Sequence, residues 1–160
     1  MEVNEISLSK NQVKPVIDLL NDYLANYQIH YQKLRGAHWN IEGENFFTLH
    51  LKFEEFYTNA QTTIDEIAER ILTLGRHPLS TYKDYIQHAS IKEINTIGMS
   101  DRMMVKEILQ DMTTLIELER EIMDAASSAG DEGTNDMVNA FMQFKEKSCW
   151  MLRAFIGNEK

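Results

Sequence analysis

The feature that most constrains this chain is a run of 27 residues, Phe46 to Leu72, that contains neither proline nor glycine. A run of this length without a helix breaker predicts one long, continuous helix. The whole 160-residue chain has only two prolines and seven glycines, and β-branched residues rarely alternate along it. We therefore expect an all-helical protein.

Apolar residues recur at helical spacing over four long stretches, which predicts four long helices. The first is expected over about 10–38 and the second over about 45–74, where Gly75 suits the position after a helix end. Ser100 suits the cap of the third helix, which ends in the sequence SSAG. The fourth is expected to follow GDEGT, with Thr134 or Asn135 as its cap, and to end near Ile156.

Residues 75–99 form the longest irregular stretch, and the sequence TYKDYIQHAS within it predicts a short extra helix. The stretch is long enough to cross the length of a bundle. These elements predict a single domain, residues 1–160, with an all-α, ferritin-like four-helix bundle whose long crossover joins helices two and three.

Four side chains within the second predicted helix are of the kinds that bind metal ions: His50, Glu54, Asp65 and Glu69. At about 100° per residue they fall at roughly 0°, 40°, 60° and 100° around the helix axis, so they share one face. His50 and Asp65, however, are separated by about 22 Å along the axis, whereas metal–ligand bonds are about 2.0–2.6 Å long. Each end of the helix therefore carries half a site.

A second copy of the chain, running antiparallel about a two-fold axis near Tyr57 and Thr58, would bring the two halves together. His50 of one chain would then lie beside Asp65 and Glu69 of the other, which predicts a dimer with two identical interface sites. His38, at the end of the first helix, is a further candidate ligand. The alternative is that the carboxylates form a solvated acidic face and that His50 is a buried, hydrogen-bonded histidine.

Di-iron helical bundles that hold their metal within one chain use two Glu-x-x-His elements. None of the glutamates in this sequence is followed by histidine three residues later. A site of that kind is therefore not expected, and any ferritin-like chemistry has to lie between chains.

The net charge of −9 and a pI near 5.0 favour cations as partners over nucleic acid or anionic membranes. No window approaches 18 uninterrupted apolar residues, so no membrane span is expected, and the first ten residues do not resemble a signal peptide. The lone cysteine, Cys149, excludes an internal disulfide and predicts a reducing, cytoplasmic location.

The run GAHWNIEGENFFTLHLKFEEFYTNAQTTIDEIAERI closely resembles the signature of the Dps family, the mini-ferritins also called DNA-binding proteins from starved cells. The resemblance extends over essentially the whole chain, through the crossover to the ending CWMLRAFIG. In this family the ferroxidase centre takes two histidines from one subunit and acidic residues from its two-fold neighbour. The matching residues here are His38, His50 and Glu54 on one side, with Asp65 and Glu69 on the other.

The resemblance implies a ferroxidase and iron store in which twelve subunits form a hollow shell. Such a shell oxidises Fe(II), preferentially with hydrogen peroxide rather than oxygen, at two iron positions per inter-subunit site, and stores the ferric mineral. Two ferrous ions held together give two electrons to one peroxide, which avoids release of hydroxyl radical. Glu54 stands where the family often has aspartate, so the second iron position is where this chain departs from the pattern. Zinc suits the same ligands as a surrogate for iron.

By the same resemblance, acidic residues near the start of the last helix line three-fold pores, and the candidates here are Asp131, Glu132 and Asp136. Their alternative role is that of ordinary acidic residues at a helix N-terminus. Trp39, beside His38, matches a family position close to the metal centre and is a candidate radical trap. Packing at the dimer interface is the alternative for this tryptophan.

Family members that bind DNA generally use a mobile tail rich in lysine and arginine. The first ten residues of this chain hold Glu2, Glu5 and only Lys10 as charged residues, and the last four are GNEK. Neither tail can neutralise several phosphates, so direct DNA binding at physiological salt is not expected. Two alternatives to the ferroxidase remain: a shell that compacts DNA, and a protein that sequesters a divalent ion such as Zn(II) without redox chemistry.

Overall fold

The computed structural model of the chain describes residues 2–157 and contains four long helices and one short one. They are α1 (Lys10–Asn40), α2 (Phe46–Thr73), α3 (Tyr82–His88), α4 (Asp101–Ala129) and α5 (Glu132–Ile156). The extended pairing found in the described residues is an isolated bridge between Val3 and Ser9. The prediction of an all-helical fold with a short helix between the second and third long helices is confirmed.

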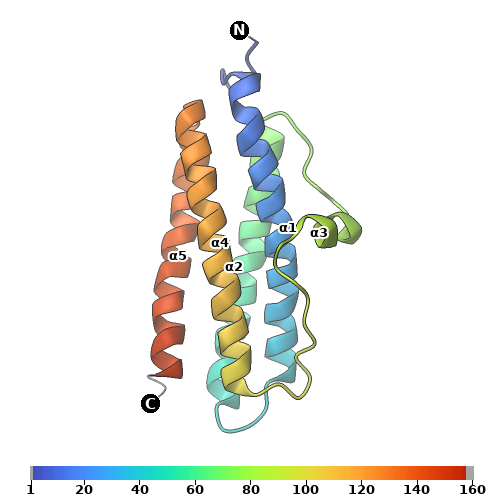
Figure 1. Cartoon of the computed structure of the whole chain (residues 1–160), viewed down its shortest axis with the longest axis vertical. Coiled ribbons are helices and arrows are strands. Elements are labelled where there is room, and N and C mark those ends of the chain that lie inside the picture. The colour runs from blue at the N-terminus through green and yellow to red at the C-terminus, as the bar shows by residue number, and fades with distance from the viewer. Residues whose placement is uncertain (1, 158–160) are drawn as a thin grey trace.

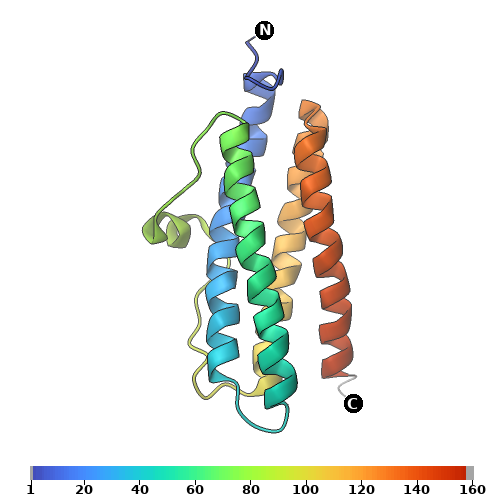
Figure 2. The ribbon, with the colours of Figure 1, turned by 180° about the vertical axis from the view of Figure 1, so that it is seen from behind.

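The long helices form two antiparallel hairpins that pack into one bundle (Figure 1). A loop of residues 41–45 joins α1 to α2, and a tight turn at Gly130 and Asp131 joins α4 to α5. The crossover, residues 74–100, runs from one end of the bundle to the other along the outside of α1 and carries α3 (Figures 1 and 2). As a consequence α2 and α4 run in the same direction, which is the ferritin-like arrangement.

Local capping chemistry accounts for where most of the helices start and stop. The Ser100 hydroxyl accepts a hydrogen bond from the backbone N–H of Met103 at 3.3 Å, as expected for the cap of α4. Gly75 follows the end of α2 with φ of 91°, a left-handed conformation that glycine adopts without steric cost. Both of these sequence-based assignments are confirmed.

The start of α5 differs from the expectation that Thr134 or Asn135 caps it. The helix begins at Glu132, and Asp131 is the cap, with its side chain accepting from the Thr134 backbone N–H at 3.1 Å. An aspartate carboxylate is a strong N-cap. Because Asp131 directly follows Gly130, the residue that caps the end of α4, the turn between the two helices is short. The helix therefore starts about one turn earlier than predicted.

The core is built from the apolar stripes of all four long helices. Its largest apolar side chains with under 2% exposure include Phe53, Leu20, Leu34, Ile67, Ile71 and Met104. Burying side chains of this size stabilises a fold by roughly 1.5–3 kcal/mol each. The bundle is therefore held by ordinary apolar burial, and polar groups inside it need a separate explanation.

Four polar side chains meet inside the bundle and form what we call the interior cluster: Tyr23, Tyr27, Glu119 and Lys145. The Lys145 ammonium lies 2.6 Å from Glu119 Oε1 and donates to the Tyr27 hydroxyl at 2.6 Å, and the Tyr23 hydroxyl donates to the same carboxylate oxygen. Burial opposes the charge of Lys145, but Tyr27 and Glu119 outweigh this effect and raise its pKa. Among the described residues, Glu119 Oε2 is buried without a hydrogen-bond partner.

A second buried group lies along α1, where His30 and Lys33 both contact Asp111 of α4. The Asp111 carboxylate lies 3.2 Å from His30 Nδ1 and accepts from the Lys33 ammonium at 2.7 Å. Burial lowers the pKa of His30 despite the neighbouring carboxylate, so the ring is neutral at pH 7. His30 therefore connects α1 to α4 inside the bundle.

Candidate metal centre

The α1–α2 hairpin brings His38 and His50 into direct contact. His38 lies in the last turn of α1 and His50 in the second turn of α2, and the loop between the helices folds one against the other. Their rings are stacked, with centroids 3.8 Å apart and planes inclined by 18°. We call these two residues the histidine pair.

Each histidine of the pair donates a hydrogen bond to the backbone of the other. His38 Nδ1 lies 2.7 Å from the His50 carbonyl oxygen, and His50 Nδ1 lies 2.7 Å from the His38 carbonyl oxygen. A carbonyl oxygen only accepts, so Nδ1 must carry the hydrogen in both rings. In the neutral imidazole this leaves Nε2 with a lone pair, and a histidine oriented through its other nitrogen is the usual metal-binding arrangement.

Aromatic residues hold the histidine pair in place. Phe46 stacks on His50 with centroids 4.9 Å apart, and Tyr57 meets His38 edge-on at 5.2 Å. His38 is 8% exposed, and His50 is half-buried. Neither of these two aromatic contacts was predicted from the sequence. The available signal was spacing, because Phe46 precedes His50 by four residues and so shares its helix face.

The carboxylates predicted as ligands lie on the surface of α2. Glu54 is exposed one turn after His50, while Asp65 and Glu69, which we call the acidic pair, are exposed farther along the same helix. Because α2 continues without a break from Phe46 to Thr73, the acidic pair lies about 22 Å along the axis from the histidine pair. Within residues 2–157, no three His, Cys, Asp or Glu side chains of one chain gather around a common point that could hold an ion.

Comparisons with known proteins identify the family. The ferritin-like domain family matches residues 17–160, and the chain is 41% identical to DNA protection during starvation protein 2 of Bacillus anthracis over 90% of this chain and 98% of that protein. The fold matches the crystal structure of the Dps protein of Vibrio cholerae O1, with a TM-score of 0.95 and 40% identity over 98% of both chains. The chain belongs to the Dps family. A Dps protein of Bacillus brevis is similarly close, with a TM-score of 0.88 and 42% identity over 92% of this chain and 98% of that one.

Proteins of the Dps family bind metal and assemble from several subunits. The Vibrio cholerae protein is described as a member of a broad superfamily of ferritin-like diiron-carboxylate proteins. Dps-family proteins bind iron and form oligomeric shells. Among the described residues, no helix has both the length and the apolar character needed to cross a membrane.

The acidic residues at the start of α5 fall into two groups in this Dps-family chain. Asp131 is 1% exposed, and its carboxylate is bound by the Arg70 guanidinium at 2.5 Å and by Thr134. It is therefore committed to capping α5 and is not free to line a pore. Glu132 and Asp136 are exposed on the first turns of the helix, so the pore prediction rests on these two residues.

Trp39 lies next to the histidine pair in the sequence but faces outward. The side chain is 57% exposed, and the Arg35 guanidinium lies over its ring at 4.9 Å from the centroid. An exposed indole in the single chain leaves room for the predicted packing at a dimer interface, and the predicted role as a radical trap stays a prediction.

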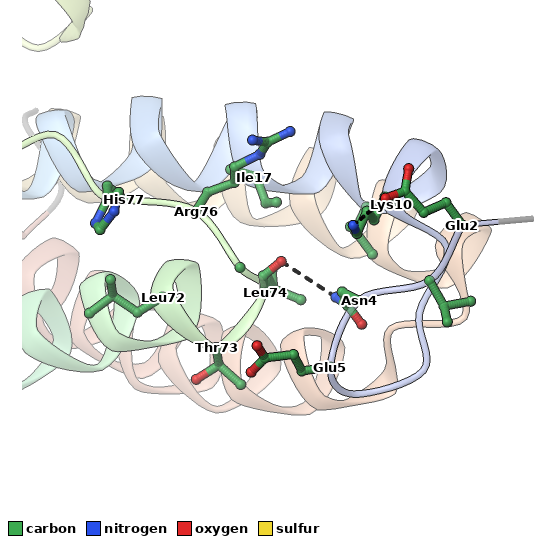
Figure 3. Close-up of a pocket in the computed structure, with 13 residues that line it drawn as sticks. Glu2, Asn4, Glu5, Lys10, Ile17, Leu72, Thr73, Leu74, Arg76 and His77 are labelled. Carbon is green, nitrogen blue, oxygen red and sulfur yellow. Dashed lines mark hydrogen bonds and ion pairs between the residues drawn. The ribbon is translucent and has the colours of Figure 1, made fainter.

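The N-terminal segment is folded against the end of α2. Asn4 donates from its side-chain amide to the Leu74 carbonyl oxygen at 3.4 Å, and Lys10 pairs with Glu2 at 2.5 Å (Figure 3). Together with the start of the crossover, the segment lines an open pocket of about 720 Å³ at the end of α2 away from the histidine pair. Residues 158–160 of the other tail lie outside the described part of the chain.

Proposed function

We propose that this protein is a ferroxidase and iron-storage mini-ferritin whose oxidation sites form between two chains. The observation that carries the proposal is the division of ligands along α2. The histidine pair is fixed in one tautomer with Nε2 left for a metal, while the acidic pair lies about 22 Å away on the same helix. An isologous dimer satisfies both halves at once and creates two equal sites.

In this proposal the histidine pair and Glu54 bind Fe(II) from one subunit, and the acidic pair binds from its neighbour. Imidazole and carboxylate ligands together suit Fe(II). Two ferrous ions supply two electrons, and with two protons these reduce one hydrogen peroxide to two waters, so no hydroxyl radical is released. Dissolved oxygen is the alternative and slower acceptor.

The wider assembly is also part of the proposal. Twelve subunits, built from two-fold dimers, form a cytoplasmic shell that stores the ferric product and protects the cell against oxidative damage. Exposed Glu132 and Asp136 attract Fe(II) at the pores, and exposed Trp39 takes up stray oxidising equivalents. The net charge of −9 supports cations over nucleic acid as the working partners.

The test is Fe(II) oxidation by the metal-free protein, measured anaerobically with hydrogen peroxide and in parallel with dissolved oxygen. The proposal predicts fast oxidation with about two Fe(II) consumed per peroxide, because two one-electron donors serve one two-electron acceptor, and a much slower rate with oxygen. If neither oxidant reacts faster than with iron in protein-free buffer, the proposal is wrong. Sequestration of a redox-inert ion at the same ligands would then explain the site better.

A further inference from the structure

A polar contact connects the end of α2 to the first turn of α5. Arg70 of α2 donates from Nη2 to Asp131 Oδ1 at 2.5 Å and from Nε to Thr134 Oγ1 at 2.9 Å. Thr134 in turn donates to Asp131 through its backbone N–H at 3.1 Å and its hydroxyl at 2.5 Å. We call Arg70, Asp131 and Thr134 the clasp.

Two of the three clasp residues are buried, so the Asp131 carboxylate relies on the Arg70 guanidinium to balance its charge. Asp131 and Thr134 are 1% and 0% exposed, and the Arg70 side chain is 18% exposed. A buried carboxylate without a cation is strongly destabilising. Removing the Arg70 guanidinium therefore leaves the negative charge of Asp131, the cap of α5, without a cation. It also removes the contact between the first turn of α5 and α2.

Gly133 provides a second, independent observation. A Cβ atom placed on this glycine would lie 2.8 Å from Arg70 Nη2 and 3.1 Å from Arg70 Cζ. A Cβ contact of 2.8 Å is too short, so the guanidinium, at the end of a flexible side chain, would have to shift from its position beside Asp131. Glycine at position 133 therefore leaves the space that the Arg70 guanidinium occupies at the start of α5.

The clasp sits between two sets of residues that the proposed function uses. Arg70 directly follows Glu69 of the acidic pair, and Asp131 directly precedes Glu132, with Asp136 one helical turn farther on. We propose that Arg70 is a positioning residue that fixes the exposed acids of α5 relative to the acidic pair of α2, and so sets how readily Fe(II) reaches the oxidation site. This inference rests on the ferroxidase function proposed above.

The kinetic test uses Arg70→Ala, Arg70→Lys and the double variant Glu132→Gln/Asp136→Asn in the assembled protein. Initial rates of peroxide-dependent Fe(II) oxidation are measured over a range of Fe(II) concentrations. We expect Arg70→Ala to raise the half-saturating Fe(II) concentration by about threefold to tenfold, a size typical of coupled residues, with the maximal rate within about twofold of the wild type. Arg70→Lys keeps the charge but not the forked geometry, so it should restore only part of the loss.

Combining the variants separates positioning from a general structural effect. Arg70→Ala added to Glu132→Gln/Asp136→Asn should cause no further rise, because both changes act through the same acids. Arg120→Ala, which removes an exposed arginine paired with Glu146, is the matched control and should leave both parameters unchanged. An unchanged half-saturating concentration in Arg70→Ala, a loss confined to the maximal rate, or fully additive effects would overturn the proposal. A wild-type protein that does not oxidise Fe(II) would contradict the ferroxidase itself.

Melting temperatures measured without iron test the clasp independently of iron oxidation, also for variants that assemble poorly. Gly133→Ala should lower the melting temperature when Arg70 is present, because the new methyl group displaces the guanidinium. In the Arg70→Ala background the same change should leave the melting temperature equal or higher, since alanine favours helix over glycine. Equal shifts in the two backgrounds would show that Gly133 does not serve Arg70 and would overturn the clasp.

Discussion

The interior cluster and the metal half-sites are both polar, but they differ in where their charges are balanced. Inside the bundle, Lys145 and Glu119 neutralise each other, and Tyr27 completes the contact within one chain. In the α1–α2 hairpin, His38 and His50 use one ring nitrogen each to fix their orientation, and in the proposed function the other nitrogen binds a metal ion. The charges of the first group are balanced within the chain, whereas the proposed metal site needs carboxylates from a second chain.

The difference indicates which polar residues serve folding and which serve function. The interior ion pair is closed within the chain, so we assign it to folding. We assign the histidine pair, which is held in one tautomer, and the exposed acidic pair on the same helix to the proposed metal binding. The variants below test this division, starting with the largest expected effect.

Breaking the interior cluster should cost the most stability. Lys145→Met leaves the buried Glu119 carboxylate without its cation, which should lower the free energy of unfolding by about 3–5 kcal/mol. Urea denaturation at matched protein concentration measures the loss. Lys145→Met/Glu119→Gln should regain much of it, because the uncompensated charge is gone. Iron oxidation per folded protein should stay near the wild-type value, and a stability loss under about 1 kcal/mol would contradict this account of the cluster.

Removing the acidic pair should change stability little and reduce the rate of iron oxidation strongly. Asp65→Ala/Glu69→Ala changes two exposed side chains, so stability should shift by no more than about 0.5 kcal/mol per site. The rate of peroxide-dependent Fe(II) oxidation should fall by about 100-fold or more, since ligand loss costs at least as much as loss of an outer partner. Glu66→Ala, an exposed carboxylate on the same helix, is the matched control. Retention of the full rate would remove the acidic pair from the site.

A smaller effect is expected from pH, through His30. Burial lowers the pKa of this ring, so below the unfolded-state value of about 6.5 the unfolded chain binds a proton that the folded chain does not. The contribution of His30 to stability is therefore complete above that pH and declines as the pH falls below it. Melting temperatures measured from neutral to mildly acidic pH should decline less steeply in His30→Gln, while exposed His77→Gln should follow the wild type. Parallel curves for all three proteins would be inconsistent with a buried neutral His30.

The smallest expected effect is on DNA mobility. The described N-terminal residues are folded against α2, with Lys10 already paired to Glu2, and the chain is net acidic. Few phosphates can then be neutralised, and binding should be undetectable at moderate salt. A gel-shift assay without divalent metal checks this. A retarded band under those conditions would mean that the DNA-compacting alternative applies to this chain.

Most of the fold could be predicted because its determinants are local. Helix spacing, the Ser100 cap and Gly75 are all readable from neighbouring residues, and the structure confirms them. The role of Asp131 was not predictable in this way, since its partner Arg70 lies on another helix and is 61 residues away in the sequence. The same limitation hid the contact between Glu119 and Lys145, which lie on different helices.

For the site, the sequence predicted which residue types share a face of α2 but not how the histidines are held. The stacking of His38 on His50 depends on the loop of residues 41–45, and their reciprocal hydrogen bonds use backbone atoms that no side-chain motif records. The joining of the two halves remains a prediction. It depends on a second chain, and a single chain contains only the separate parts.

Mixing two inactive subunits is the most direct test of a site shared between chains. One subunit carries His38→Ala/His50→Ala and the other Asp65→Ala/Glu69→Ala, and the two are unfolded, mixed equally and reassembled. Each mixed dimer then contains one intact site and one empty site, so random pairing should restore about a quarter of the wild-type sites and a similar share of the oxidation rate. Each variant reassembled alone should stay inactive. A mixture no more active than its components would contradict the shared site.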